Sequence, residues 1–169
     1  MSNRSNESLR QITDMKYFIH GDSMNTPTSD YYVNYFFNNA KHGEKYYWNW
    51  WPFLFGPFWF VLRKMYAFGL LFFLIQVTCL VIFNKLTSLY STGIIQLIEY
   101  LFLAIIGIVT GNIANYLYFL KFKKNYDKAP EIRNKRNDYF SKKGGLSISS
   151  CGFLLLLLIA YYLYQNNFF

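Results

Sequence analysis

Three long apolar stretches, residues 65–83, 94–120 and 146–164, constrain the fold of this chain more than any other feature. The first contains no charged side chain at all. A helix needs about 20 apolar residues to cross the hydrocarbon core of a bilayer, and each stretch has about that length. A helix of a soluble domain would instead keep one polar face toward water. The sequence therefore predicts an all-α membrane protein with three transmembrane helices.

The first 45 residues are polar and carry five basic and five acidic side chains. They contain no apolar stretch of the length that a signal peptide requires, so we expect the first span to act as its own insertion signal. Residues 1–29 are rich in Ser, Asn, Thr and Asp, and we expect a mobile tail there. The membrane domain then covers residues 30–169. It begins with an aromatic helix over residues 30–42, which either lies on the membrane interface or packs on the rest of the protein.

An aromatic segment over residues 46–62 precedes the first span. It contains all four tryptophans of the chain, which are Trp48, Trp50, Trp51 and Trp59. The segment is too short to cross a bilayer as a helix, and Pro52 and Pro57 interrupt it. Trp and Tyr prefer the level of the lipid headgroups. We therefore predict an interfacial or re-entrant hairpin with interfacial tryptophans.

Basic residues predict the orientation of the chain. Residues 121–143 carry nine Lys or Arg against three acids, and Arg63 and Lys64 precede the first span. The positive-inside rule places the N-terminus and the basic loop over residues 121–145 in the cytoplasm, with the C-terminus outside. We expect anionic headgroups, rather than nucleic acid, to be the partner of these cations. The predicted lipid contacts are Arg63, Lys64, Lys121, Lys123, Lys124, Arg133, Lys135 and Arg136.

Three short motifs resemble the bacterial family known as domain of unknown function 2628. They are Trp48-Asn49-Trp50 with Phe55-Gly56-Pro57-Phe58-Trp59 and Arg63-Lys64-Met65-Tyr66, then Asn115-Tyr116-Leu117-Tyr118, and finally Gly144-Gly145-Leu146-Ser147. The sequence departs from the family pattern at Pro52, Leu62 and Ala114, where the family tends to have Ala, Tyr and Gly. The resemblance implies a small multi-pass protein of the bacterial inner membrane, and it implies no reaction, ligand or catalytic residue.

Small residues recur every three or four positions along the second span and predict a helix-packing face. They are Ala104, Gly107, Gly111 and Ala114. Residues of this size let two helix backbones approach closely in lipid. The face fits either another helix of this chain or a second copy of the protein.

Polar side chains inside the apolar stretches are the remaining candidates for function. They are Gln76, Glu99, Asn112 and Asn115. An ionisable residue such as Glu99 is costly in hydrocarbon and often marks a functional site. Glu99 also lies close enough to the outer boundary to reach water. Asn112 and Asn115 are placed to bond backbone groups that the prolines of the hairpin leave free.

No catalytic, metal or cofactor motif occurs in the sequence. His20 and His42 have no Cys or His partner at metal-binding spacing, so we expect no cofactor. We expect a non-enzymatic inner-membrane component that binds a partner, either another membrane protein or a second copy, or helps to assemble a complex. The alternative is a subunit of a small pore or transporter, since broken helices often line transport sites.

Overall fold

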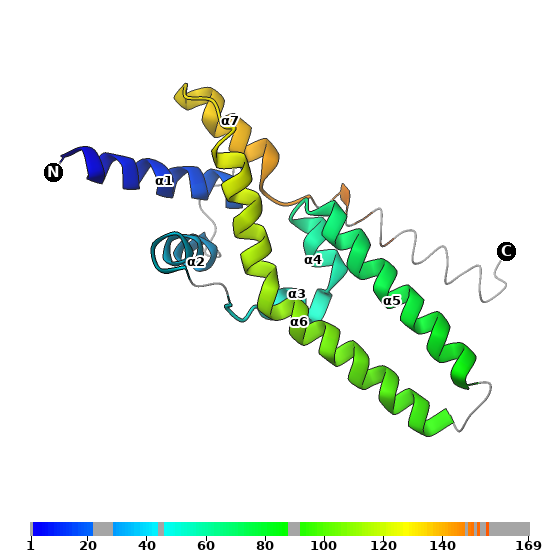
Figure 1. Cartoon of the computed structure of the whole chain (residues 1–169). Coiled ribbons are helices and arrows are strands. Elements are labelled where there is room, and N and C mark those ends of the chain that lie inside the picture. The colour runs from blue at the N-terminus through cyan, green and yellow to red at the C-terminus, as the bar shows by residue number, and fades with distance from the viewer. Residues whose placement is uncertain are drawn as a thin grey trace.

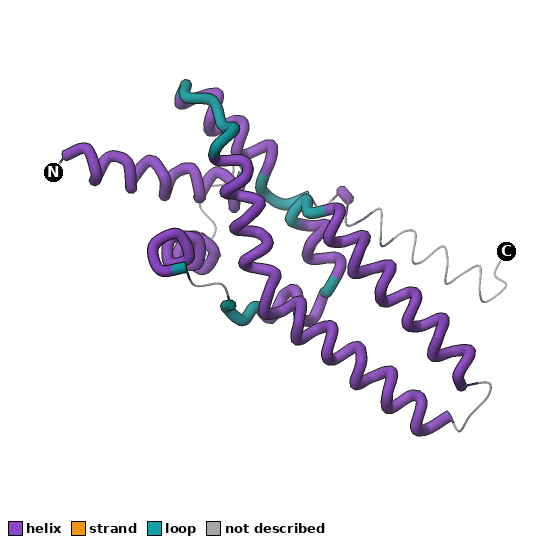
Figure 2. The backbone as a smooth tube through the Cα atoms, in the orientation of Figure 1, coloured by secondary structure: helices purple, strands orange, loops and turns teal. Residues whose placement is uncertain are grey.

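The computed structural model describes residues 2–21, 29–43, 46–87, 92–147, 149, 150, 152 and 155. Every regular element in these ranges is a helix, as Figure 2 shows, so the all-α prediction is confirmed for this part of the chain. In chain order the helices are α1 (Ser2–His20), α2 (Ser29–His42), α3 (Trp50–Phe55), α4 (Pro57–Leu62), α5 (Tyr66–Thr87), α6 (Thr92–Tyr126) and α7 (Arg133–Lys143).

Helices α5 and α6 are long and apolar enough to cross a membrane. The apolar stretches within them run over Tyr66–Leu86 and Gly93–Tyr126, and few of their side chains are buried within the protein. Exposed apolar residues surround most of both helices, which fits a lipid solvent. The structure therefore supports two of the three predicted spans. The third, residues 146–164, lies outside the described residues except at six positions.

Helix α6 is continuous over 35 residues but passes through two environments. Its first half lies beside α5, where the rings of Phe83 and Phe102 are 6.1 Å apart between centroids. Its second half extends past the start of α5 and meets α1, α2 and α7 (Figure 1). We call α1, α2, α7 and residues 114–126 of α6 the head domain. Apolar side chains with no exposed surface in and beside it are Met15, Phe18, Phe36, Phe60, Ala114, Tyr118 and Phe140.

The short helices α3 and α4 form a hairpin between α5 and α6 (Figure 1). Gly56 separates them with φ +47°, a conformation that favours glycine, and Pro57 starts α4. On one side, Phe53 of α3 lies so close to Gly107 that a Cβ there would be 3.1 Å from its ring. On the other side, a Cβ on Gly69 of α5 would overlap Val61 of α4. Glycines therefore let the hairpin fit closely between the two long helices.

A turn at Arg63 and Lys64 connects α4 to α5. The N–H of Met65 donates to the carbonyl oxygen of Phe60 over 2.7 Å, and the N–H of Lys64 donates to that of Val61 over 2.9 Å. This pair of bonds is the Schellman motif that ends many helices. Lys64 has φ +55° at the position where glycine is most common. The turn reverses the chain so that α5 returns alongside the hairpin.

The prediction of a mobile tail over residues 1–29 is wrong for residues 2–20, which form α1. Met15, Phe18 and Ile19 are buried in the core of the head domain. Their helical spacing gives this otherwise polar segment a narrow apolar face. Burial of that face stabilises the helix. A mostly polar segment can therefore dock on the protein through a few apolar side chains.

Helix α2 packs on the protein instead of presenting its aromatic face to a membrane. Tyr32, Tyr35 and Phe36 are at most 3 % exposed, and their rings contact the ring of Tyr118 on α6 or that of Tyr47 before the hairpin. Of the two interpretations of residues 30–42, the structure therefore supports packing on the rest of the protein. The predicted interfacial helix is corrected accordingly.

The predicted basic loop over residues 121–145 is also corrected, because most of it is helical. It contains the end of α6 and all of α7. After α7, the N–H of Gly145 donates to the carbonyl oxygen of Phe18 over 2.6 Å. A Cβ on Gly144 would overlap the same carbonyl group. The pair Gly144-Gly145 thus allows close contact between the end of α7 and the end of α1.

Candidate functional site

A buried network of polar side chains lies where the hairpin, α2 and α6 meet. At its centre, Nδ2 of Asn49 donates to Oδ1 of Asn115 over 2.8 Å. Asn49 also begins α3, because its Oδ1 accepts from the N–H of Trp51 over 3.0 Å. Its own N–H donates to the carbonyl oxygen of Gly111 over 2.9 Å. Asn49 therefore fixes the start of the hairpin on α6.

Tyrosines of α2 complete the hydrogen bonding of the two asparagines. Nδ2 of Asn115 donates to the hydroxyl of Tyr31 and to the carbonyl oxygen of Tyr47, over 2.8 and 3.2 Å. The Tyr31 hydroxyl in turn donates to the carbonyl oxygen of Trp48 over 2.8 Å. Burial raises the pKa of Tyr31 to about 12, so this hydroxyl remains a donor to a higher pH than that of an exposed tyrosine.

The hydroxyl of Tyr32 is a second meeting point in the same network. It accepts from Nδ2 of Asn49 over 3.1 Å and from Nε1 of Trp59 over 3.3 Å. Trp59 is 4 % exposed, so its indole bonds within the buried network and does not contact lipid headgroups. The prediction of an interfacial Trp59 is therefore wrong, because its indole N–H finds a buried partner.

Arg63 lies at the edge of the network and is 8 % exposed. Its guanidinium lies 4.4 Å from the ring centroid of Tyr32 and 5.1 Å from that of Tyr118. Its Nη1 donates to the carbonyl oxygen of Ile19 over 3.1 Å. Arg63 thus joins α1, α2 and α6 through cation–π contacts and one hydrogen bond. The prediction that Arg63 contacts anionic lipid is wrong, because burial keeps it from the headgroups.

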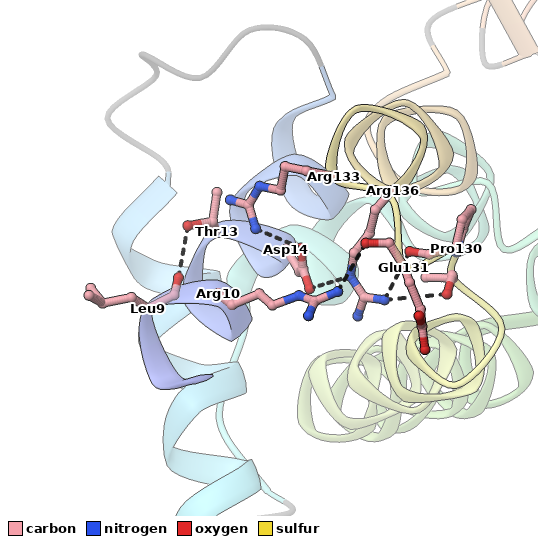
Figure 3. A network of polar contacts seen from close by, with 9 residues as sticks. Leu9, Arg10, Thr13, Asp14, Pro130, Glu131, Arg133 and Arg136 are labelled. Carbon is pink, nitrogen blue, oxygen red and sulfur yellow. Dashed lines mark hydrogen bonds and ion pairs between the residues drawn. The ribbon is translucent and has the colours of Figure 1, made fainter. Parts of the chain in front are cut away.

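Arg136 is the second predicted lipid contact that is buried. Its Nε donates to Oδ2 of Asp14 over 2.8 Å, and the two side chains are 7 % and 0 % exposed (Figure 3). Arg133, whose side chain is 46 % exposed, approaches the other oxygen of Asp14 at 3.9 Å. Figure 3 shows both arginines reaching from α7 toward α1. These residues join α1 to α7, and the lipid-contact prediction is wrong for Arg136.

The remaining predicted lipid contacts divide between bound and exposed cations. Nζ of Lys121 is partly buried and donates to the carbonyl oxygens of Arg63 and Lys64. Nζ of Lys64 donates to the carbonyl oxygen of Lys142 over 3.0 Å. The exposed cations of the set are Lys123, Lys124, Lys135 and, in part, Arg133.

The small-residue face of α6 lies largely against the hairpin of the same chain. Gly107 and Gly111 meet Phe53 and the backbone of Asn49. Ala114 has no exposed surface, whereas Ala104 is exposed. The hairpin thus occupies the part of the face nearest the head domain.

The predicted polar residues of the spans lie in different places. Gln76 is beside the hairpin turn, since a Cβ on Gly56 would lie 3.4 Å from its Nε2. Glu99 is partly buried. Asn112 donates to the carbonyl oxygen of Ile108 in its own helix over 2.8 Å. Only Asn115 of this set belongs to the buried network.

The tryptophans other than Trp59 lie near the surface of the hairpin. Trp50 and Trp51 are more than half exposed, and Trp48 is partly buried against Trp50 and Phe53. Exposed indoles at this place fit the predicted interfacial role.

Sequence reasoning missed Thr110, which supports the proline-broken backbone directly. Its hydroxyl hydrogen is shared between the carbonyl oxygen of Pro52 over 3.1 Å and that of Gly107 in its own helix over 2.9 Å, and the residue has no exposed surface. The sequence signal that could have identified it is a threonine beside the glycines of a helix-packing face, because a threonine hydroxyl can bond a backbone carbonyl that a proline leaves without its helical partner.

The chemistry of the network is that of a structural joint. Its amides and hydroxyls are bound to one another and to backbone groups. Among the described residues, no group of three or more His, Cys, Asp or Glu is placed to hold a metal ion.

Comparison with known proteins gives a family and no function. No curated protein and no solved structure matches the chain. One family model matches residues 32–124, which is more than half of the chain and includes the hairpin, α5 and nearly all of α6. It also includes both asparagines at the centre of the buried network. The chain therefore belongs to the family described as Protein of unknown function (DUF2628), as its motifs predict.

Proposed function

We propose that the protein is a non-enzymatic component of the bacterial inner membrane that binds a partner or helps to assemble a complex. The buried network supports this proposal, because it joins the head domain to the hairpin and to α6. A rigid connection of this kind holds a surface at a fixed place above a membrane. The polar groups that a catalyst would direct at a substrate are bound to one another here.

The proposal places α5 and the first half of α6 across the bilayer. The 22 residues of α5 extend about 33 Å at 1.5 Å per residue. The hydrocarbon core is about 30 Å thick. The exposed cations of the head domain, such as Lys123 and Lys124, favour the cytoplasmic side for that domain.

The proposal also makes the α3–α4 hairpin re-entrant. Its turn at Gly56 lies beside Gln76, ten residues into α5, which corresponds to a depth of about 15 Å. Irregular backbone at that depth needs partners within the protein. Thr110 supplies one to the carbonyl of Pro52, and Gly111 supplies one to the N–H of Asn49.

A hollow on the head domain offers a place for the partner. It has a volume of about 330 Å³ and lies between α1, α2 and α6. Asn39, Tyr116, Phe119 and Lys123 are among its lining residues. Mixed aromatic and polar linings of this size accept side chains of another molecule.

Native mass spectrometry of the detergent-extracted protein tests the proposal. We expect a stoichiometric partner or an oligomer, and a photocrosslinker at Lys123 should capture it. The same crosslinker at Leu101, an exposed residue of α6 far from the head domain, should not. A strictly monomeric protein in mild detergent would count against the proposal.

A pore or transporter subunit is the second candidate. Gln76 beside the broken hairpin favours it, because discontinuous helices present free backbone groups to transported ions. Ion flux in vesicles tests it with Gln76→Leu and Glu99→Gln. If the wild type conducts no ions, or if both variants conduct as well as the wild type, this candidate is rejected.

A further inference from the structure

The described part of the protein has unequal cross-sections at its two ends in the membrane. Near the head domain, α3 packs on α6 and α4 packs on α5, so four helical segments lie side by side. Beyond Gly56 the hairpin ends, and of the helices that the structure describes α5 and α6 remain, with Phe83 against Phe102. If the hairpin is re-entrant as proposed above, this change occurs near the middle of the bilayer.

From this asymmetry we propose that the protein is a wedge that binds preferentially to membrane whose head-side leaflet is convex. Each helix with its side chains is about 10 Å wide, so two extra segments add roughly 160 Å² to one leaflet. Area added to one leaflet is accommodated best where that leaflet is stretched by outward curvature. The ligand of this surface is therefore a curved lipid bilayer.

The hairpin is fixed closely enough to act as a wedge. Gly69, Gly107 and Gly111 leave no room for a Cβ without a shift of the hairpin or of the helix beside it. Asn49 and Thr110 bind its backbone to α6. The hairpin therefore cannot fold away from the spans without breaking buried hydrogen bonds.

Exposed apolar side chains on α3 also require lipid around the hairpin. Trp50, Trp51 and Leu54 are 63, 57 and 66 % exposed. Trp51 stacks on Phe55, with ring centroids 5.5 Å apart. These side chains displace lipid from the head-side leaflet, which increases the difference between the two leaflets.

Hairpin depth is measured first, because the inference rests on the proposed re-entrant position. A thiol-reactive fluorescent label on Leu54→Cys, in protein whose Cys79 and Cys151 are replaced by Ser, is compared with the same label on Leu74→Cys and Tyr46→Cys. We expect quenching by lipid-attached probes to place position 54 near Leu74 of α5. A label at position 54 as shallow as one at Tyr46 would reject both the re-entrant position and the wedge.

Orientation in vesicles then tests the wedge itself. The unmodified protein is reconstituted into small sonicated and large extruded vesicles of one lipid composition, and protease protection reports the side of the head domain. We expect outward-facing molecules to be enriched about twofold in the small vesicles relative to the large ones. A deep label at position 54 with equal orientation in both vesicles would reject the wedge and leave the re-entrant hairpin standing.

A matched pair of variants separates the wedge from crowding of the head domain inside small vesicles. Gly107→Leu displaces the hairpin, because Phe53 lies against Gly107, whereas a Cβ at Gly93 would meet nothing within 4 Å. We expect Gly93→Leu to keep the enrichment and a helical Gly107→Leu protein to lose it. Equal enrichment in both variants would reject the wedge. If Gly107→Leu does not fold, the comparison of small and large vesicles with the unmodified protein decides.

Discussion

Asn49 and Asn115 stand 66 residues apart in the chain, and Nδ2 of one donates to Oδ1 of the other over 2.8 Å. The first lies at the start of the hairpin and the second in the half of α6 that meets the head domain. Both side chains are nearly or fully buried. This bond, together with the bond from the N–H of Asn49 to the carbonyl oxygen of Gly111, fixes how deep the hairpin lies relative to α6.

Replacing Asn115 should destabilise the protein strongly. Asn115→Ala removes one hydrogen-bond partner each from the Asn49 amide, the Tyr31 hydroxyl and the Tyr47 carbonyl, although Asn49 still donates to Tyr32 and Tyr31 still donates to Trp48. Each buried donor or acceptor that is left without its bond costs about 1–3 kcal/mol. Thermal unfolding in detergent measures the loss. Asn112→Ala is the control, since Asn112 is less buried and bonds to a carbonyl oxygen of its own helix. A similar loss of unfolding temperature in this variant would contradict the prediction.

Neutralising Asp14 should release α1 from α7. Asp14→Asn leaves the buried guanidinium of Arg136 without its carboxylate, and breaking such a pair costs about 3–5 kcal/mol. Limited proteolysis should then cut α1 faster. The exposed pair of Asp138 and Lys142 provides the matched control, because Asp138→Asn should change stability by a few tenths of a kcal/mol at most.

A methyl group at Gly144 should separate the end of α7 from α1. The new Cβ would overlap the carbonyl of Phe18, which is backbone and cannot move aside as a side chain would. Overpacking of this kind costs about 1–3 kcal/mol or more. Gly93→Ala meets no atoms and should be neutral or slightly stabilising. Equal unfolding temperatures for the two variants would refute the close contact.

Alkaline pH should weaken the network through Tyr31. Burial raises its pKa to about 12, whereas an unfolded chain has a value near 10. Above about pH 10 the unfolded state loses this proton while the folded state keeps it, so stability is full below pH 10 and falls as the pH rises toward 12. The difference in unfolding free energy between the wild type and Tyr31→Phe should shrink over that range. A constant difference would show that Tyr31 titrates normally.

Apolar length and proline spacing predicted the long helices and the hairpin, since both depend on local sequence. Burial of individual residues depends on distant partners and could not be predicted in this way. Arg63 reaches Ile19, and Arg136 reaches Asp14 across 122 residues, so a count of cations assigned both to lipid. Helix α1 was missed because its apolar face is narrow within a polar segment. The role of Thr110 depends on its place beside Pro52, which spacing alone did not show.

The unbroken course of α6 has a mechanical consequence. A single rod of 35 residues enters both the apolar layer and the head domain, without a hinge between them. Any change in its tilt, such as one caused by a thinner bilayer, must swing the head domain by the same angle. A partner bound to the head domain would move with it, so its position would depend on the thickness of the bilayer.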